Sequence, residues 1–232
     1  MQILSSHLDI HLPRRLFHMT FGIILGGVGL YLEPKSTFVF FLAALTLISL
    51  GMEIFRLAVP SFNHFSQIFM RPFLRDCEKK QMTGATYYLI GCTIAAIVFP
   101  RAIAVLSIFY LGLGDPVASL VGLKYGRKIF SKQWLSYFSG RSFPWAQKSL
   151  EGSLACFFVC FLATFFVTFH LGKTEHFSLN DRFLFSVLGG AAAMLGEFLP
   201  LRTDDNLSLP LISGAALWLS ATVFHLLPGL YF

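Results

Sequence analysis

The sequence has few charged residues for its length. Only 13% of its 232 residues are Asp, Glu, Lys or Arg, whereas soluble domains contain about 25%. Long apolar runs stand in their place: 55% of the residues are hydrophobic, 27 are phenylalanine, and the mean hydropathy is +0.67. This composition excludes an ordinary soluble globule and predicts an integral, multi-pass membrane protein.

Cysteine is scarce, and common catalytic and metal-binding motifs are missing. The four cysteines lack metal-ligand spacing, and Cys156 and Cys160 stand four residues apart in an apolar run, as packing residues do. The sequence contains no Gly-x-Ser-x-Gly, no His-Glu-x-x-His and no Cys-pair metal pattern. Residues 1–15 have no signal-peptide pattern, because polar and charged residues precede the first apolar run. Any site therefore has to be sought among the charged residues.

Positive charge dominates among these few residues. There are 18 Lys and Arg against 12 Asp and Glu, which gives a formal net charge of +6. A basic chain can bind nucleic acid, but here the charge is confined to short loops between apolar runs. Such a distribution favours membrane topology and anionic head groups, so we expect no nucleic-acid partner.

Seven apolar runs predict an all-α, polytopic transmembrane helical bundle, because each is near the 20 or so residues that cross a bilayer. We expect one integral-membrane domain over residues 1–232. The stretch Gly112–Pro116 interrupts the fourth run and predicts a broken fourth span. The predicted spans are 16–32, 36–57, 84–100, 102–123, 149–170, 183–200 and 208–230.

The charges of the loops predict the orientation. With the N-terminus in the cytoplasm, fourteen of the 18 Lys and Arg residues fall on the cytoplasmic side, which is the positive-inside pattern. The outer side keeps Lys35, Arg101, Lys173 and Arg182. The acids that the same topology brings to the cytoplasmic side are Glu53, Asp115, Glu151, Glu197, Asp204 and Asp205. One cytoplasmic face therefore receives nearly every charge that an active site would use.

Asp115 is the most informative acid, because a carboxylate inside hydrocarbon costs a few kcal/mol or more and is rare without a function. Pro116 follows Asp115 directly, and this pair suits a helix start, where the carboxylate caps the helix and proline needs no amide hydrogen. Free amides at such a start would favour phosphate. A simple kink capped by its own carboxylate is the alternative. Gly114 and Ser119 give this segment small faces.

A strongly basic loop follows Asp115. It carries six positive and no negative side chains and ends at Lys148, three residues before Glu151 and so on the same helical face. A lysine beside an acid can orient phosphate while the acid holds a cation, although an ordinary interfacial ion pair has the same spacing. The six basic residues, which suit phosphate groups, are Lys124, Arg127, Lys128, Lys132, Arg141 and Lys148.

A further acidic group precedes the last span. Glu197 is followed by Asp204-Asp205-Asn206, before a span that contains Pro210. Two adjacent acids and an amide supply oxygen ligands of the kind that Mg²⁺ uses with nucleotide phosphates. A charged turn is the alternative.

Four features have structural interpretations at least as good as functional ones. They are the Glu53–Arg56 and Arg75–Glu78 pairs, His18 and the amphipathic stretch 60–80. Each pair, taken singly, is interpreted as structural. The histidine suits a head group, a phosphate or packing. The amphipathic stretch predicts a helix in the membrane interface, either as a lipid guide or as a connector.

Several of these elements recur in one known family. In order along the chain they are Arg14-Arg15-x-x-His18, Glu53-x-x-Arg56, Arg75-x-x-Glu78, Thr83-Gly84-Ala85-Thr86-Tyr87, Gly114-Asp115-Pro116-x-Ala118-Ser119, Gly122-x-x-x-Gly126-Arg127, Lys148-Ser149-Leu150-Glu151-Gly152-Ser153, Glu197 and Asp204-Asp205-Asn206-Leu207-x-x-Pro210. The chain resembles the CTP-dependent lipid kinases: dolichol kinase, phytol kinase and the CTP-type diacylglycerol kinase. These are distant relatives of phosphatidate cytidylyltransferase, whose His-Gly-Gly and Asp-Arg elements are missing here.

The resemblance implies transfer of the γ-phosphoryl group of a nucleoside triphosphate, usually CTP, to the hydroxyl of a membrane lipid alcohol. Polyprenol, phytol and diacylglycerol all qualify as acceptors, and a divalent cation, Mg²⁺ or another, is implied as cofactor. Nucleotidyl transfer to a lipid phosphate and a non-enzymatic lipid transporter or lipid-binding protein are the alternatives. No feature of the sequence specifies an oligomeric state.

Roles for the individual residues follow as hypotheses. The predicted catalytic residues are Asp115, Lys148, Glu151, Glu197 and Asp205, of which Asp205 or Glu197 would take the proton of the lipid hydroxyl. The predicted metal ligands are Asp115, Glu151, Asp204 and Asp205. The predicted nucleotide-binding residues are Gly114, Ser119, Arg127, Lys128, Ser149 and Gly152.

Overall fold

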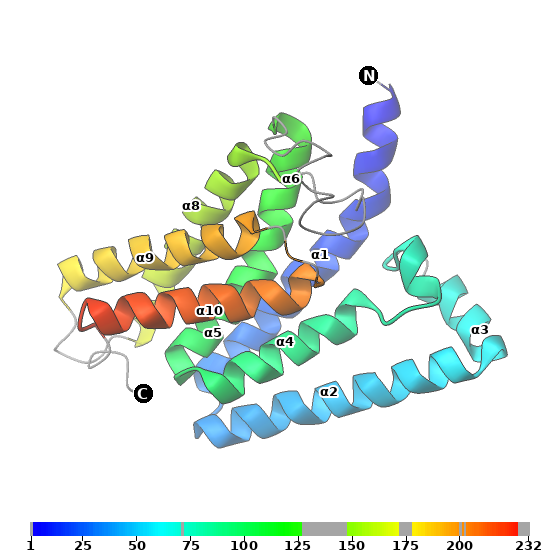
Figure 1. The fold of residues 1–232 in the computed structure, drawn as a ribbon, viewed down its shortest axis with the longest axis horizontal. Helices are drawn as coiled ribbons and strands as arrows, with labels where there is room; N and C mark the ends of the chain where they lie inside the picture. The colour runs from blue at the N-terminus through cyan, green and yellow to red at the C-terminus, as the bar shows by residue number, and fades with distance from the viewer. Residues whose placement is uncertain are drawn as a thin grey trace.

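The structure is a computed structural model that describes residues 2–70, 72–126, 148–171, 178–199, 201 and 203–226. Over these residues the chain is built of helices, as the apolar runs predict (Figure 1). The α-helices are α1 (Gln2–Tyr31), α2 (Lys35–Ala58), α3 (Pro60–Met70), α4 (Gly84–Val98), α5 (Arg101–Phe109), α6 (Asp115–Tyr125), α8 (Leu150–Leu171), α9 (Leu179–Phe198) and α10 (Asp205–Val223). A 3₁₀ turn, η1 (Asp76–Lys79), and a π-helical turn, η2 (Tyr110–Gly114), complete the described elements.

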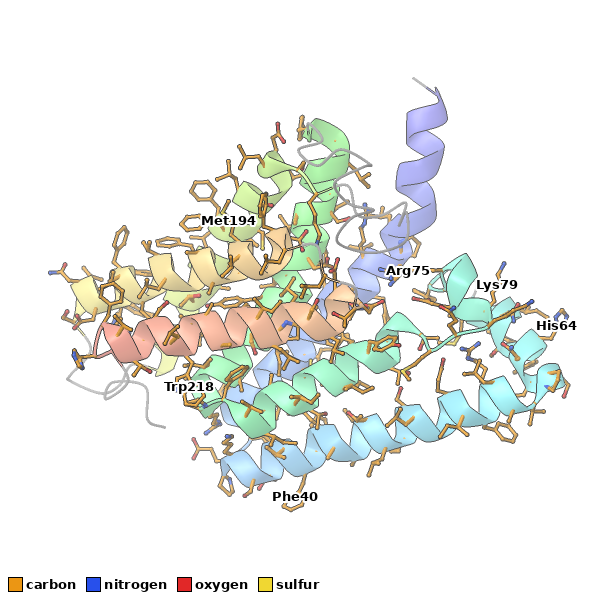
Figure 2. The ribbon with its side chains drawn as sticks, in the orientation of Figure 1. Phe40, His64, Arg75, Lys79, Met194 and Trp218 are labelled. Carbon is orange, nitrogen blue, oxygen red and sulfur yellow. The ribbon has the colours of Figure 1, made fainter. Side chains whose placement is uncertain are left out.

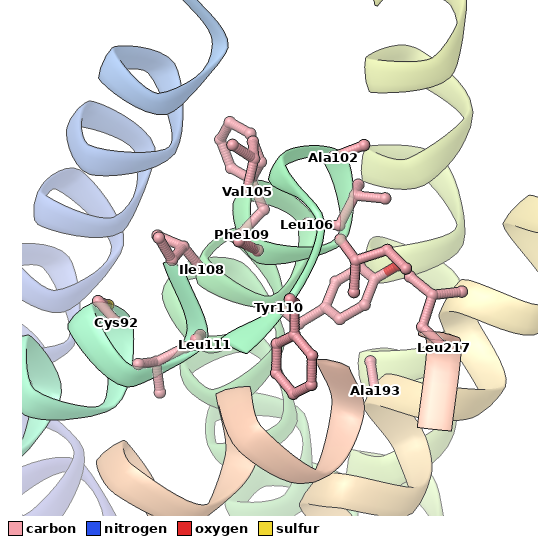
Figure 3. Packing of buried hydrophobic residues seen from close by; sticks show 14 of the residues in the cluster. Cys92, Ala102, Val105, Leu106, Ile108, Phe109, Tyr110, Leu111, Ala193 and Leu217 are labelled. Atoms are coloured by element: carbon pink, nitrogen blue, oxygen red, sulfur yellow. The ribbon is translucent and has the colours of Figure 1, made fainter. Parts of the chain in front are cut away.

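The helix formed by α5, η2 and α6 lies at the centre of the bundle. It is continuous from Arg101 to Tyr125 and apolar enough to cross a membrane. Helices α1, α4, α8 and α10 pack against it, and its first half is buried throughout. Figure 3 shows Tyr110 of η2 on the side of this helix that faces Leu217 of α10 and Ala193 of α9. The hydrophobic core therefore surrounds the segment that leads to Asp115.

The predicted break in this span is not confirmed. Gly114 (φ −64°, ψ −54°) and Asp115 (φ −59°, ψ −51°) both have right-handed helical torsion angles, so the helix continues where we expected a helix to start. Pro116 has no amide hydrogen to donate, and the wider π-helical turn before it accommodates the missing hydrogen bond without breaking the helix. A continuous helix therefore presents Asp115, and its carboxylate does not cap free amides.

Glycines let the central helix approach its neighbours closely. A β-carbon added to Gly112 would lie 2.7 Å from the Cα of Gly22 in α1. A β-carbon added to Gly114 would lie 2.9 Å from the Sγ atoms of both Cys156 and Cys160 in α8. Both cysteines are fully buried, in agreement with their interpretation as packing residues. These contacts fix the turn before Asp115 between α1 and α8.

In the described part of the chain, four helices are long and apolar enough to span a membrane: α2, the α5–η2–α6 helix, α8 and α10. The predicted number of seven spans is thus not confirmed, although a helix lies at each of the other three predicted positions. Helix α4 has 15 residues, which is short for a bilayer. Helices α1 and α9 contain charged residues, among them Arg14 and Glu197, that reduce their apolar character.

The outer surface of the bundle is apolar, as a lipid-facing surface has to be. Helix α2 lies at the edge of the bundle beside α4 (Figure 1) and buries Phe38 and Leu42. On its other side Phe40 is 73% exposed and Leu47 is 70% exposed. Figure 2 shows Phe40 pointing away from the bundle. A soluble monomer rarely exposes an apolar face of this extent, whereas a membrane protein requires one.

Cations cap helix C-termini at the end of the bundle opposite Asp115. Arg101 donates hydrogen bonds to the carbonyl oxygens of Gly29 and Leu30 near the end of α1. Lys35 donates to the carbonyl of Ile97 near the end of α4, and Arg182 donates to that of Thr168 near the end of α8. Positive charge at a helix C-terminus is favourable because it complements the helix dipole. The cations at this end therefore have a structural role.

The tight contact between α1 and η2 predicts a specific stability effect. Replacing Gly22 with Ala puts a β-carbon against the backbone of Gly112, so we expect a loss of about 1–3 kcal/mol of stability from overpacking. Gly27→Ala is the matched control on the same helix, because among the described residues nothing beyond the adjacent backbone of α1 lies within 4 Å of its added β-carbon. Thermal unfolding of the purified protein in detergent measures both, and equal midpoints for the two variants would contradict the close contact.

Candidate active site

A buried lysine joins the ends of three helices. Lys148 stands just before α8, Glu197 is in the last turn of α9, and Asp205 opens α10. The Nζ atom of Lys148 lies 3.2 Å from Glu197 Oε1 and 3.0 Å from Asp205 Oδ2. Lys148 is only 9% exposed and Glu197 only 7%. Because an unpaired buried charge is strongly destabilising, each of these groups depends on the others.

The charge state of Lys148 follows from its surroundings. Burial alone would lower the pKa of Lys148, but the carboxylates of Glu197, Asp205 and Asp115 outweigh it and raise that pKa above its usual value. Lys148 is therefore a cation at any physiological pH. Because the pKa of Lys148 is raised in the folded state, its positive charge stabilises the fold below the ordinary lysine pKa, and this contribution is lost as the pH rises through the raised value. Asp115 is among the carboxylates that raise the pKa of Lys148, so it lies at the same end of the bundle.

A second network surrounds the start of α10. Asp204 is the N-cap of this helix, and its Oδ1 accepts a hydrogen bond from the amide of Asn206 at 3.0 Å. Its Oδ2 accepts a hydrogen bond from Arg75 Nη1 at 3.0 Å. The side chain of Asn206 donates to the carbonyl of Gly84 at 3.0 Å. The Asp-Asp-Asn element thus ties α10 to α4 and to the segment that carries Arg75, which Figure 2 labels between α1 and α3.

Arg14 and Glu78 extend this network to α1. Arg14 Nη2 lies 3.6 Å from Glu78 Oε1, and Arg75 Nε lies 3.9 Å from the same oxygen. The Glu78 carboxylate also accepts hydrogen bonds from the amides of Arg75 and Gly84. Burial lowers the pKa of Arg14, and the nearby positive charge of Arg75 acts in the same direction. Two guanidinium groups are therefore held close together at this end, an arrangement that suits an anion.

Asp115 faces α1. Its Oδ2 lies 4.0 Å from His18 Nε2, and its side chain is 27% exposed. Among the described residues it forms no ion pair with a lysine or arginine, in contrast to Glu197, Asp204 and Asp205. Arg15 lies about one turn before His18 in α1, and its buried Nη1 atom has no hydrogen-bond partner in the described part of the chain. Asp115 and Arg15 thus have capacity left for a ligand, as do His18 Nε2, the Tyr88 hydroxyl and Glu197 Oε2, which are also buried without a hydrogen-bond partner in the described part of the chain.

The small residues of the predicted nucleotide site pack helices against each other. The Ser149 hydroxyl accepts a hydrogen bond from the amide of Gly152 at 3.1 Å, as a helix N-cap does. A β-carbon added to Gly152 would lie 2.6 Å from the carbonyl oxygen of Ala118 in α6, and Gly122 lies against Ser149 in the same way. Ser149, Gly152 and the Gly-x-x-x-Gly pair therefore have a structural role in the α6–α8 contact, as does Gly114 in its contact with α8.

Of the other residues predicted for the site, the structure describes Ser119 and Glu151. Ser119 in α6 and Glu151 in the first turn of α8 are both partly buried. Arg127 and Lys128, predicted to bind phosphate, lie outside the described residues. The structure therefore brings together Asp115, Lys148, Glu197, Asp204 and Asp205, and it adds Arg14, Arg15, His18, Arg75 and Glu78 to them.

The predicted magnesium ligands do not form a single centre. The described ranges contain no group of three or more His, Cys, Asp or Glu side chains that could hold a metal ion. Both carboxylate oxygens of Asp204 already accept hydrogen bonds, and Asp205 pairs with Lys148. Among the described residues, the proposed ligands Asp115, Glu151, Asp204 and Asp205 are therefore not gathered around one cation site, because Arg75 and Lys148 bind Asp204 and Asp205 while Asp115 faces His18.

The Glu53–Arg56 pair has a structural role, in agreement with the interpretation of its sequence. Arg56 is 3% exposed and donates to the Glu53 carboxylate and to the carbonyls of Glu78 and Gln81. Glu53 accepts a hydrogen bond from the amide of Thr83 at 2.8 Å. The pair thus fixes the 78–83 segment that leads into α4 and carries Glu78 to the site.

One residue of this site has more partners than the sequence predicts, and another gives no signal in the sequence. The i, i+3 spacing pairs Glu78 with Arg75 alone, whereas in the structure Glu78 also contacts Arg14 and Gly84. Tyr88 gave no signal, because a tyrosine in an apolar helix usually belongs to the core. Its hydroxyl is in fact buried without a hydrogen-bond partner among the described residues, and its ring packs against His18.

These features define a membrane-embedded helical protein with a site of paired acids and cations at one end. The chain is 30% identical over 226 residues to CTP-dependent diacylglycerol kinase 1 of Schizosaccharomyces pombe, covering 90% of this chain and 92% of that protein. It is also 30% identical over 225 residues to CTP-dependent diacylglycerol kinase 1 of Eremothecium gossypii, covering 87% of this chain and 64% of that protein.

A third relative, an uncharacterized protein of Rickettsia prowazekii, is 26% identical over 225 residues, which cover 95% of this chain and 97% of that protein. The sequence matches no protein-family model and no solved structure. The chain belongs to the CTP-type lipid kinase family, as its motifs indicate.

The structural role of Arg56 can be tested against a second arginine–carboxylate pair, in which the carboxylate is exposed. Arg56→Ala leaves Glu53 buried without its partner, so we expect a loss of about 3–5 kcal/mol and little folded protein. Glu33→Ala also removes one member of an arginine–carboxylate pair, but the Glu33 side chain is 71% exposed. The buried Arg101 keeps its hydrogen bonds to the carbonyls of Gly29 and Leu30, so we expect a loss of at most about 1 kcal/mol. Thermal unfolding in detergent measures both. An Arg56→Ala variant that is as stable as Glu33→Ala but inactive would contradict the structural role.

Proposed function

We propose that this protein is a CTP-dependent kinase that transfers the γ-phosphoryl group to the hydroxyl of a membrane lipid alcohol. Diacylglycerol is the first acceptor to test, because two relatives that align with most of this chain are named for it. Polyprenols and phytol share the same hydroxyl chemistry. We treat residues 1–232 as one domain with its site on the cytoplasmic side, in line with the positive-inside pattern.

The observation that carries this proposal is the convergence of Asp115, Lys148 and the Arg14–Arg75 pair at one end of an apolar bundle. Phosphoryl transfer needs mainly positioning and charge neutralisation. Lys148 supplies a permanent positive charge, and Arg15 offers a buried guanidinium donor that has no partner among the described residues. A phosphate oxygen is a natural acceptor for such a donor.

We assign Asp115 the role of accepting the proton of the lipid hydroxyl. The lipid hydroxyl oxygen forms a bond to the γ-phosphorus, the bond from that phosphorus to the β–γ bridging oxygen breaks, and CDP leaves. The hydroxyl proton passes to a carboxylate, and Asp115 replaces the predicted Asp205 or Glu197 in this role. Lys148 binds Asp205 Oδ2 and Glu197 Oε1, and the remaining oxygen of Glu197 is buried. Asp115, in contrast, is partly exposed and has no lysine or arginine partner among the described residues.

Product analysis separates this function from nucleotidyl transfer. Incubation with labelled CTP and a panel of lipid alcohols yields lipid phosphate and CDP from a kinase. A nucleotidyltransferase yields a CDP-lipid and pyrophosphate from a lipid phosphate. A transporter or lipid-binding protein yields neither, and its acids would line a path across the bilayer rather than gather at one end.

Replacement of the two central groups tests the site. We expect Asp115→Asn and Lys148→Ala each to lower kcat/KM at least about 100-fold, because loss of one group that acts on the transition state typically has an effect of this size. Asp181→Asn is the matched control, since Asp181 caps α9 at the opposite end of the bundle. Activity that survives in both site variants within a few-fold of the control would contradict the assignment.

Replacement of Arg15, whose Nη1 atom has no hydrogen-bond partner among the described residues, tests the binding of the phosphoryl donor CTP. We expect Arg15→Gln to raise the KM for CTP about 10-fold, because a charge-assisted hydrogen bond contributes about 1.5–3 kcal/mol. Lys80→Gln removes the same charge from an exposed position outside the predicted phosphate-binding loop and should leave this KM unchanged. Equal effects from both variants would indicate a general electrostatic contribution rather than a contact with the nucleotide.

A further inference from the structure

Two buried polar atoms of neighbouring side chains lack hydrogen-bond partners within the described ranges: His18 Nε2 and the Tyr88 hydroxyl. The two rings pack edge to face with their centroids 4.6 Å apart. Tyr88 is 2% exposed, and the His18 side chain is 11% exposed. Leaving such groups unpaired is unfavourable, so a pair of them at one place indicates a position built for a hydrogen-bonding ligand.

The backbone around these atoms explains why they stay unpaired. Gly22 lies one turn after His18 on the same face of α1, and a β-carbon added to it would lie 2.6 Å from the Tyr88 hydroxyl. A β-carbon added to Gly112 would lie 3.3 Å from that hydroxyl. The Tyr88 hydroxyl is therefore held where α1 and the π-helical turn meet, and no side chain in the described part of the chain forms a hydrogen bond with it.

Asp115 provides a third polar group at the same place. It follows η2 directly, and its Oδ2 lies 4.0 Å from His18 Nε2, which is too far for a direct hydrogen bond. An oxygen atom of a ligand placed between these two groups could hydrogen-bond to both. The Asp115 carboxylate also disfavours an anionic ligand here, so the arrangement selects a neutral hydroxyl over a phosphate.

Aromatic side chains connect this position to the outer apolar surface. Phe17 is 50% exposed and Phe73 is 38% exposed, and their ring centroids lie 5.5 Å apart. Phe17 stacks on Phe21 at 5.8 Å, and Phe21 packs edge to face on Tyr88 at 5.6 Å. A continuous series of rings thus leads from the lipid-facing surface to the buried tyrosine hydroxyl.

We propose that His18, Tyr88 and Asp115 bind the hydroxyl of the lipid acceptor, and that the Phe17–Phe21–Phe73 aromatic series holds the adjoining part of its hydrocarbon chain. This inference rests on the proposed kinase function and adds its acceptor subsite. The subsite takes an uncharged lipid with a hydroxyl group near the membrane surface. Once the hydroxyl is phosphorylated, repulsion between the new phosphate and Asp115 favours release of the product.

Kinetics of a single-atom substitution test the subsite. We expect Tyr88→Phe to raise the KM for the lipid alcohol about 3- to 10-fold, the effect of one lost hydrogen bond, and to leave the KM for CTP unchanged. His18→Gln should act in the same direction. Tyr87→Phe is the matched control, because it removes the same hydroxyl from the adjacent position and should change neither constant. Thermal unfolding verifies that the variants are folded.

A purely structural role predicts a different result. Tyr88→Phe would then remove an unpaired buried hydroxyl, raise or preserve thermal stability, and leave both KM values unchanged. That result, with a wild-type enzyme that is active, overturns the subsite.

Photolabelling without nucleotide makes the test independent of catalysis. A diazirine-bearing diacylglycerol should label residues 17–21 or 73, unlabelled diacylglycerol should compete, and Tyr88→Phe should reduce the competable label. If wild-type protein phosphorylates no alcohol but this label is found, the kinase proposal fails and the binding subsite stands. Competable label that maps only elsewhere on the protein refutes the subsite, whatever the kinase activity.

Discussion

The ammonium group of Lys148 is the interaction on which the arrangement of the site depends. It binds Glu197 at the end of α9 and Asp205 at the start of α10, while its own backbone leads into α8. Three helices that are hydrophobic along most of their length thereby end at one shared charge. Hydrocarbon packing has little directional preference, so it cannot fix how far one such helix slides along another. Buried ion pairs have a defined geometry and set that register.

The central helix supplies the second constraint. Its glycines at positions 112 and 114 bring it against α1 and α8, and its π-helical turn carries the chain past Pro116 without a break. Asp115 therefore stands on a continuous helix, directly after its buried first half, rather than on a loop. Rigid placement suits a group that has to meet a reacting hydroxyl, because small displacements of a catalytic group have large effects on rate.

The sequence predicted the helical bundle, the positions of its helices and the gathering of acids at one end, because hydropathy and loop charge determine these features directly. It could not predict the continuous helix at Asp115, since the same Gly-Asp-Pro letters fit a helix start and a π-helical turn equally well. Nor could it distinguish a metal ligand from a partner of a cation: Asp204 and Asp205 differ in role only through Arg75 and Lys148, which are distant in sequence. Such pairing is a property of tertiary structure.

Charge balance at the site bears on how CTP is bound. The carboxylates Glu78, Asp115, Glu197, Asp204 and Asp205 face the cations Arg14, Arg15, Arg75 and Lys148, so the described part of the site has no excess of positive charge. A triphosphate adds several negative charges, and in a low-dielectric setting these require compensation. The described arginines supply directed hydrogen bonds rather than net charge. In the proposed function this compensation has to come from cations outside the described part of the site, and Arg127 and Lys128 are the residues that the sequence predicts for it.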